Sequence, residues 1–193
     1  MINNKIVPQS IGMYNSEFEH DACGVGFVAH IKGKKSHSIV EQGLTILERL
    51  THRGAVAADG KSGDGCGILL QFPEPFLRDV AEECKFKLAE HFASGLVFFS
   101  PDPKLIARGQ KILKKRLSRA ALDVVGWREV PTCPEVVGEQ ALESMPAIYQ
   151  VFVNAPAGWR PHDIERQLFA ARRLAFEEEK SLPDPDPLYY VVS

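Results

Sequence analysis

The second half of the sequence twice repeats one pattern, a strand, a long helix and another strand, and this repetition restricts the fold most strongly. Four apolar runs have the length and composition of strands, at 95–99, 123–127, 147–155 and 188–192. A basic helical pattern at about 103–119 connects the first two runs, and a second helical pattern at about 161–180 connects the last two. The order predicts an α+β fold in which about 94–193 form a ferredoxin-like split βαβ lobe.

The first half, about 23–90, carries a shorter succession of elements. The run CGVGFVAHI (23–31) alternates like a strand, with apolar side chains on one face at Val25, Phe27, Ala29 and Ile31. Glycines occupy the other face, where a close approach by another group is expected. A capping box at Ser38 predicts a helix whose apolar stripe includes Ile39, Gly43, Ile46, Leu47 and Leu50. A glycine-rich loop, a second and buried strand at 66–72 and a helix at about 75–85 follow.

The charge balance narrows the classes of partner. Lys+Arg 23 against Asp+Glu 25 gives a formal net charge of −2, which argues against nucleic acid or an anionic membrane surface as the main partner. The basic run 111–119 is interpreted as a solvated helix face, because the acidic run 177–180 offsets its charge. No apolar run approaches the roughly 18 residues of a membrane span.

The first 22 residues and the four cysteines indicate the cellular compartment of the protein. Residues 1–22 lack the apolar core of a secretory signal, so a cytoplasmic location is expected. The four cysteines are then reduced thiols: Cys23, Cys66, Cys84 and Cys133. Their spacing suggests neither a zinc site nor a redox pair, and no metal is expected. Cys66 opens an apolar strand and is interpreted as a core residue.

Cys23 stands where the first strand begins, after a polar leader. A free cysteine has a pKa of about 8.5, whereas an α-amino group has a pKa of about 7.7–8 and is a suitable general base near neutral pH. If the chain were cut before Cys23, one residue would supply both the nucleophile and its base. The alternatives are a buried structural cysteine and a thiol redox sensor, for which no resolving cysteine is visible at a useful spacing.

Arg53 and Gly54 follow the first helix, in the run THRG. The planar guanidinium of Arg53 could clamp a carboxylate or main-chain carbonyls near the cysteine. The alternative is a cation that interacts favourably with the carboxyl end of the helix. The residues alone do not decide between these two roles.

Three segments of the sequence together resemble a known family. They are EHDACGVGF (19–27), LTHRGAVAADGKSGDGCGILLQ (50–71) and FVNAPAGWRP (152–161). They are similar, in the same order, to the N-terminal glutamine amidotransferase domain of the large subunit of bacterial NADPH-dependent glutamate synthases. The resemblance implies a class II amidotransferase with the N-terminal-nucleophile (Ntn) hydrolase fold, a four-layer αββα sandwich.

In that family a propeptide is removed, so that the catalytic cysteine becomes the first residue. By resemblance, 1–22 are the propeptide and 23–193 the leading part of the domain. Cys23 then attacks the side-chain amide of L-glutamine, releasing ammonia and glutamate, while Arg53 and Gly54 hold the cysteine end and line the pocket.

The resemblance also implies cofactors and partners outside this sequence. The ammonia converts 2-oxoglutarate to glutamate on further domains of the large subunit, which carry FMN and an iron–sulfur cluster. A smaller subunit with FAD oxidises NADPH. No cofactor is expected in 1–193.

The sequence departs from the family at two places. The family binds the glutamine carboxylate through an RFSTN-like segment and forms its oxyanion hole from HNGEINT, and neither occurs here. Because the last predicted strand also runs to the final residue, the sequence is interpreted as part of a longer domain. It is expected to be inactive alone, and the alternative is an inert structural or interaction module.

Overall fold

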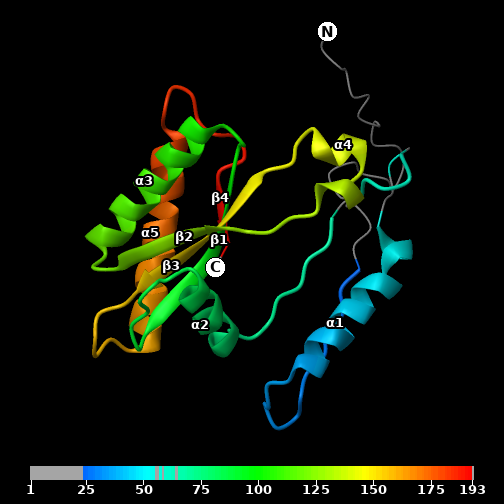
Figure 1. Cartoon of the computed structure of the whole chain (residues 1–193), viewed down its shortest axis with the longest axis horizontal. Helices are drawn as coiled ribbons and strands as arrows, with labels where there is room; N and C mark the ends of the chain where they lie inside the picture. The colour runs from blue at the N-terminus through cyan, green and yellow to red at the C-terminus, as the bar shows by residue number, and fades with distance from the viewer. Residues whose placement is uncertain (1–23, 55–56, 58, 64, 193) are drawn as a thin grey trace, which may run out of the picture. The chain divides into compact units, whose positions relative to one another are not determined.

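The computed structural model describes residues 24–54, 57, 59–63 and 65–192, apart from the side chain of His52. Cys23 and the predicted leader 1–22 therefore lie outside the described residues. The chain forms two compact units, which divide between Gln71 and Phe72 (Figure 1). No helix in the described ranges is long and apolar enough to cross a bilayer.

The first unit is built on helix α1 (His37–Arg49), which confirms the predicted helix. Its N-cap is Ser36, and no side chain caps it, so the predicted capping box at Ser38 is wrong. The Ser38 hydroxyl instead lies 2.9 Å from that of Ser36. One turn of 3-10 helix, η2 (Thr51–Arg53), follows α1 directly.

The two strands predicted in the first unit are not formed in the described residues. Residues 24–30 and 66–71 have no regular secondary structure, and none of their apolar side chains is buried, with Phe27 exposed at 89% and Leu69 at 96%. A strand needs a neighbouring edge for its main-chain hydrogen bonds, and neither segment has one in the described chain.

The second unit contains one antiparallel sheet. Its strands are β1 (Phe92–Phe99), β2 (Asp123–Glu129), β3 (Ala147–Asn154) and β4 (Tyr190–Val192), in the order β2-β3-β1-β4. Because each neighbouring pair is antiparallel, β1 runs parallel to β2, and β3 runs parallel to β4. Helix α3 (Pro103–Arg119) joins the first parallel pair and α5 (Pro161–Lys180) the second, each crossing over one intervening strand.

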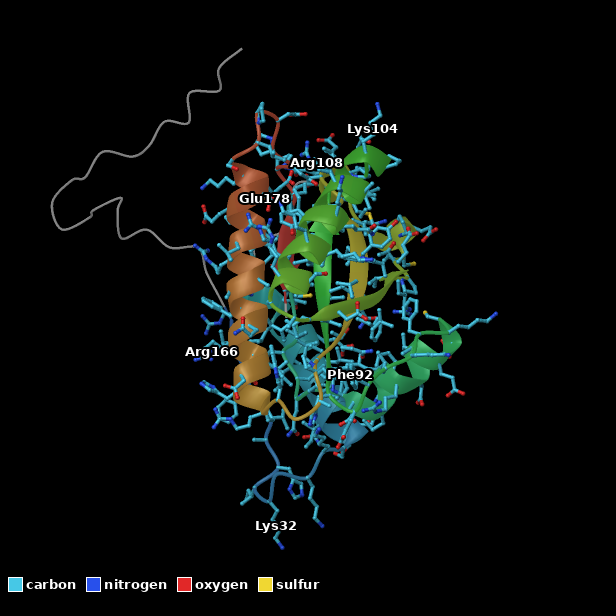
Figure 2. The ribbon with its side chains drawn as sticks, turned by 90° about the vertical axis from the view of Figure 1, so that its left-hand side faces the viewer. Lys32, Phe92, Lys104, Arg108, Arg166 and Glu178 are labelled. Carbon is cyan, nitrogen blue, oxygen red and sulfur yellow. The ribbon has the colours of Figure 1, made fainter. Side chains whose placement is uncertain are left out.

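The main core lies between the sheet and the two long helices. Figure 2 shows α3 and α5 side by side over one face of the sheet. The side chains of Val97 and Phe99 on β1 and of Val151 and Val153 on β3 are buried against them. Burial of each such side chain contributes roughly 1.5–3 kcal/mol relative to exposure. This packing fixes which face of β1 the helices cover.

A smaller core covers part of the opposite face. Helix α2 (Glu74–Glu83) packs Leu77, Val80 and Ala81 around Phe152 of β3. Phe86, which follows α2, lies against Gly126 of β2, where an added Cβ would come within 2.3 Å of the ring. Figure 1 shows α2 on the side of the sheet away from α3 and α5.

The basic helix and the acidic run form ion pairs with each other. Glu178 of α5 lies 2.6 Å from both Lys115 Nζ and Arg116 Nε of α3. Two turns earlier along α3, the guanidinium of Arg108 pairs with the buried carboxylate of Glu179. The predicted solvated face holds for Lys111 and Lys114, which are exposed, whereas Lys115 and Arg116 also join the two helices.

Two short helices lie in the connection between β2 and β3. They are η3 (Pro134–Val136) and α4 (Glu139–Leu142), and neither was predicted from the sequence. Neither buries a side chain.

Candidate active site

The only predicted site residues within the described chain, Arg53 and Gly54, end the first turn after α1. The amide of Arg53 donates a 2.8 Å hydrogen bond to the carbonyl of Leu50, and the amide of Gly54 donates to the carbonyl of Thr51. These bonds are those of one 3-10 turn, so the backbone geometry that positions Arg53 is set locally.

Gly24, the residue next to Cys23 in the chain, lies against Arg53. An ideal Cβ on Gly24 would come within 3.1 Å of Arg53 Cβ and 3.4 Å of its Cγ, and within 3.3 Å of Leu50 Cδ2. At Gly26 an added Cβ would approach Ile46 Cγ2 to 2.5 Å. The segment that begins at Gly24 is therefore seated on the α1 stripe, and the sequence-based prediction of close approach at these glycines is confirmed.

The stem of Arg53 makes this contact, while its residue as a whole is exposed. Within the described residues, its guanidinium has no ion-pair or hydrogen-bond partner. A guanidinium that is held by its aliphatic stem and keeps its donors unused is suited to bind a carboxylate or a main-chain carbonyl.

Gly54 does not need to be glycine for the sake of its own backbone. Its φ of −103° and ψ of 150° are open to any residue, and an added Cβ would meet only Thr51 O, at 3.9 Å. A requirement for glycine at this position would therefore come from a group that approaches from outside the described residues.

The segment after the glycine-rich loop also approaches α1. Ile68 Cδ1 lies 3.0 Å from an ideal Cβ on Gly43, so the segment after the glycine-rich loop also contacts α1. Within the loop, the carboxylate of Asp59 accepts hydrogen bonds from the amides of Lys61 and Ser62. Gly60 and Gly65 have φ values of 69° and 90°, which favour glycine.

The remaining described cysteines differ in exposure. Cys66 is exposed, so its predicted core position is wrong, and Cys133 is exposed as well. Cys84 is partly buried against the α2 cluster. None of these three takes part in a disulfide. In the part of the chain that the structure describes, no three His, Cys, Asp or Glu side chains are grouped so as to hold a metal ion.

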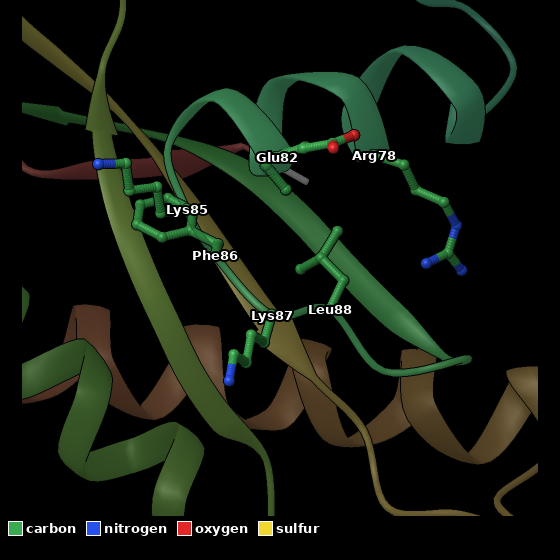
Figure 3. A pocket seen from close by; sticks show the side chains of 7 residues that line it. Arg78, Glu82, Lys85, Phe86, Lys87 and Leu88 are labelled. Carbon is green, nitrogen blue, oxygen red and sulfur yellow. The ribbon is translucent and has the colours of Figure 1, made fainter.

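Two hollows lie in the second unit. One of about 390 Å³ is open and is lined by side chains of α2 and the segment after it, including Arg78, Glu82 and Leu88 (Figure 3). The other, of about 590 Å³, lies along β1 and α5. Neither is lined by Arg53 or Gly54.

Comparison with known protein families identifies the domain. Residues 23–193 match the family described as glutamine amidotransferases class-II. The chain belongs to this family. The class II amidotransferase match thus covers the described chain and the predicted nucleophile together.

Individual relatives of this class II amidotransferase are glutamate synthases. It is 38% identical over 170 residues to the glutamate synthase [NADPH] large chain of Bacillus subtilis. The matched region covers 88% of this chain and 11% of the relative. Glutamate synthase [NADH] of Saccharomyces cerevisiae is 40% identical over 92% of this chain and 8% of its own length. Ferredoxin-dependent glutamate synthase 1 of Arabidopsis thaliana is 35% identical over 86% of this chain and 10% of its own length. The chain thus spans about a tenth of the length of these relatives.

Sequence reasoning missed the role of two residues of the amidotransferase. Ile46 and Leu50 were predicted as part of an apolar stripe, but not as the seat of the segment that follows Cys23. The signal that could have found them was the pairing of this stripe with the closely spaced glycines at Gly24 and Gly26.

Proposed function

We propose that this chain is the glutamine-binding and glutamine-hydrolysing part of a glutamate synthase, with Cys23 as nucleophile. The observation that carries the proposal is the class II amidotransferase match, which begins at residue 23 and extends to residue 193. The resemblance to glutamate synthases that use NADPH, NADH or ferredoxin supports the larger reaction. The match favours an enzymatic domain over an inert module.

The proposed chemistry balances with water as the only co-reactant. The thiolate of Cys23 attacks the side-chain amide carbon of L-glutamine, and a γ-glutamyl thioester forms as the carbon–nitrogen bond breaks. The α-amino group of Cys23, free once residues 1–22 are removed, passes a proton to the leaving ammonia. Water then cleaves the thioester, releasing glutamate and restoring the thiol.

Arg53 is proposed to hold the main chain around the cysteine. Its stem contacts Gly24, so its guanidinium can reach the main chain or a carboxylate beside the nucleophile. Gly54 is proposed to leave room for the substrate. The groups that bind the glutamine carboxylate and the oxyanion are proposed to come from a later part of the domain.

The rest of the assignment follows the family. We propose an αββα sandwich whose second unit is a ferredoxin-like split βαβ lobe, supported by the interleaved order of its four strands. FMN, an iron–sulfur cluster and an NADPH-oxidising subunit with FAD are proposed for the longer enzyme. We place it in the cytoplasm, where the thiol of Cys23 stays reduced.

The test uses a glutamine analogue that carries an electrophilic carbon. In the mature enzyme it should modify Cys23, while Cys66 and Cys133, although exposed, should react only with a general thiol reagent. Cys23→Ala should abolish glutamine-dependent synthesis and retain ammonia-dependent synthesis, whereas Cys66→Ala should retain both. Modification mainly at Cys66 or Cys133 would contradict the proposal, as would an active enzyme that still carries residues 1–22.

Chain 1–193 alone is proposed to be inactive, even when it begins at Cys23. Each missing oxyanion donor costs roughly 10²–10³ in rate, and loss of the carboxylate-binding group removes the positioning of substrate. Ammonia release from glutamine is compared between this chain and one extended through the oxyanion segment. Equal turnover would show that the pocket is already complete.

A further inference from the structure

Three buried side-chain atoms have no hydrogen-bond partner among the described residues. They are Nε of Arg108 on α3, Oε2 of Glu179 on α5 and the hydroxyl of Tyr189, which directly precedes β4. Glu179 is only 2% exposed and Tyr189 only 4%. Buried polar atoms in folded proteins are nearly always hydrogen-bonded, either to the protein or to ordered water. A partner that the described chain does not itself supply is therefore expected.

Two of these atoms belong to groups that are already in contact. Nη2 of Arg108 donates a hydrogen bond to Oε1 of Glu179. Nε and Nη2 form one edge of the planar guanidinium, as Oε1 and Oε2 form one edge of the carboxylate. Nε and Oε2 therefore flank a hydrogen bond that is already made. On the adjacent Glu178, by contrast, both oxygens are used, one by Lys115 and the other by Arg116.

Asp186 connects Tyr189 to the same carboxylate. The amide of Asp186 donates to Oε1 of Glu179, at 3.1 Å, and its carbonyl accepts from the amide of Tyr189, at 3.2 Å. The tyrosine ring also packs beside Gly109, the neighbour of Arg108 in the chain, where an ideal Cβ would lie 3.2 Å from Cδ2. Burial raises the pKa of Tyr189, and the charge of Glu179 raises it further. The hydroxyl thus stays protonated close to the carboxylate.

Other hydrogen bonds hold the guanidinium and the carboxylate in this arrangement. Nη2 of Arg108 also donates to the carbonyl of Asp184, at 2.8 Å. Oε1 of Glu179 also accepts from the amide of Asp186. A rotation that brought Nε directly onto Oε2 would lengthen these bonds. The two groups are therefore kept from forming the doubly bonded pair that arginine and carboxylates often make.

We propose that one internal water molecule bridges Nε of Arg108, Oε2 of Glu179 and the hydroxyl of Tyr189. The water accepts hydrogen bonds from the Nε–H of Arg108 and the O–H of Tyr189, and it donates one to Oε2. A buried water makes about three hydrogen bonds, and these three groups supply that number. One molecule thus completes all three groups and joins α3, α5 and the start of β4.

The chemistry of the three groups favours water over a metal cation. Two of them are donors and one is an acceptor, so their common partner has to accept as well as donate. The guanidinium of Arg108 would also repel a cation beside it. The three atoms are buried by the second unit itself. The proposed site therefore does not depend on a segment that follows Val192.

A high-resolution crystal structure of the full-length enzyme tests the proposal directly, with no reference to glutamine hydrolysis. We expect one peak of electron density at about 2.7–3.2 Å from each of the three atoms. The absence of such a peak in a well-ordered map would overturn the proposal. So would a direct hydrogen bond between Nε and Oε2, or a peak at the distances of about 2.0–2.6 Å that metal ions adopt.

Hydrogen exchange in the full-length enzyme, measured by mass spectrometry, gives a second test. Tyr189→Phe removes one donor to the water without enlarging the side chain. Peptides that cover 182–190 should then exchange about threefold to tenfold faster, because a bonded hydroxyl is lost. Tyr190→Phe is the matched control, since Tyr190 is 57% exposed, and should change exchange by less than about twofold. Unchanged or slower exchange in Tyr189→Phe would show that this hydroxyl is unpaired in the folded protein, and would overturn the proposal.

Discussion

Gly24 lies so close to Arg53 that a Cβ atom on the glycine would be 3.1 Å from the Cβ of the arginine. The residue that follows the proposed nucleophile is thus in contact with the stem of the proposed supporting cation. In the sequence the two are separated by the whole of α1. The contact joins two of the three segments by which the chain resembles its family.

Enlarging Gly24 should impair glutamine chemistry specifically. Gly24→Val would push against Arg53 and Leu50, and would displace the main chain beside Cys23. We expect glutamine-dependent synthesis by the full-length enzyme to fall roughly tenfold to a hundredfold, because small misplacements of reacting groups are costly. Ammonia-dependent synthesis should be unchanged. Steady-state rates with the two nitrogen donors provide the measurement.

Gly67→Ala is the matched control for this variant. An added Cβ at Gly67 would meet no described heavy atom within 4 Å. Both activities should therefore stay close to those of the unmodified enzyme. Equal losses in Gly24→Val and Gly67→Ala would show that the contact with Arg53 has no special role.

Removing the cation from the buried ion pair should destabilise the second unit. Arg108→Met leaves the carboxylate of Glu179, 2% exposed, without its partner. We expect a loss of about 3 kcal/mol in the free energy of unfolding, as for other broken buried pairs. Adding Glu179→Gln should restore part of it, since the amide oxygen can still accept from the amide of Asp186. Urea denaturation measures both variants.

Arg173→Met is the control for the loss of one positive charge at an exposed ion pair. Arg173 pairs with Glu177, and both side chains are more than half exposed. Its loss should change the free energy of unfolding by less than about 0.5 kcal/mol. A loss as large as that of Arg108→Met would mean that net charge, not burial, governs stability here.

Gly109→Ala should destabilise the protein although alanine favours helices. In an exposed helix the change would stabilise by about 1 kcal/mol. On α3, however, the new Cβ would lie 2.6 Å from Phe99 Cε1 and 3.2 Å from Tyr189 Cδ2, and both rings are buried. We expect a net loss of about 1–2 kcal/mol in thermal or urea unfolding. Ser118→Ala, at an exposed position of α3, should instead be neutral or slightly stabilising.

The pH dependence of stability should include a contribution from Glu178. The hydrogen bond from Lys115 lowers the pKa of this carboxyl below its ordinary 4.5, and Arg116 adds to the effect. A folded-state pKa below the unfolded one stabilises the protein above about pH 4.5, and this stabilisation is lost as the pH falls through the folded value. Glu178→Gln should therefore flatten the decline in stability in acid.

The helices and strands of the second unit could be predicted from the sequence because their patterns are local. The long helices were expected at about 103–119 and 161–180, and α3 and α5 have these bounds. Apolar spacing around a helix indicates which side is buried without reference to a partner. The four strands of the second unit were also found, because each is a short apolar run separated from the others by helical patterns or loops.

The strands expected at 23–31 and 66–72 could not be judged from local patterns alone. Alternation identifies residues that could share a face, such as Val25 and Phe27, but it does not say whether a neighbouring edge exists. The contact of Gly24 with Arg53 also has no local signature, beyond the permissiveness of glycine. Cys23 itself lies outside the described residues, so its role stays a prediction.

The interleaved order of the strands determines how long β1 remains without a partner strand during synthesis. Leu96 of β1 pairs with Gln150 of β3, which the ribosome adds 54 residues later (150 minus 96). At about 5–20 residues per second, β1 waits roughly 3–11 s for its first partner. During this interval the apolar run from Leu96 to Phe99 is followed by the lysines and arginines of α3. The same cations that later pair with Glu178 and Glu179 thus give the nascent chain a charged segment directly after this apolar strand, which lowers its tendency to aggregate.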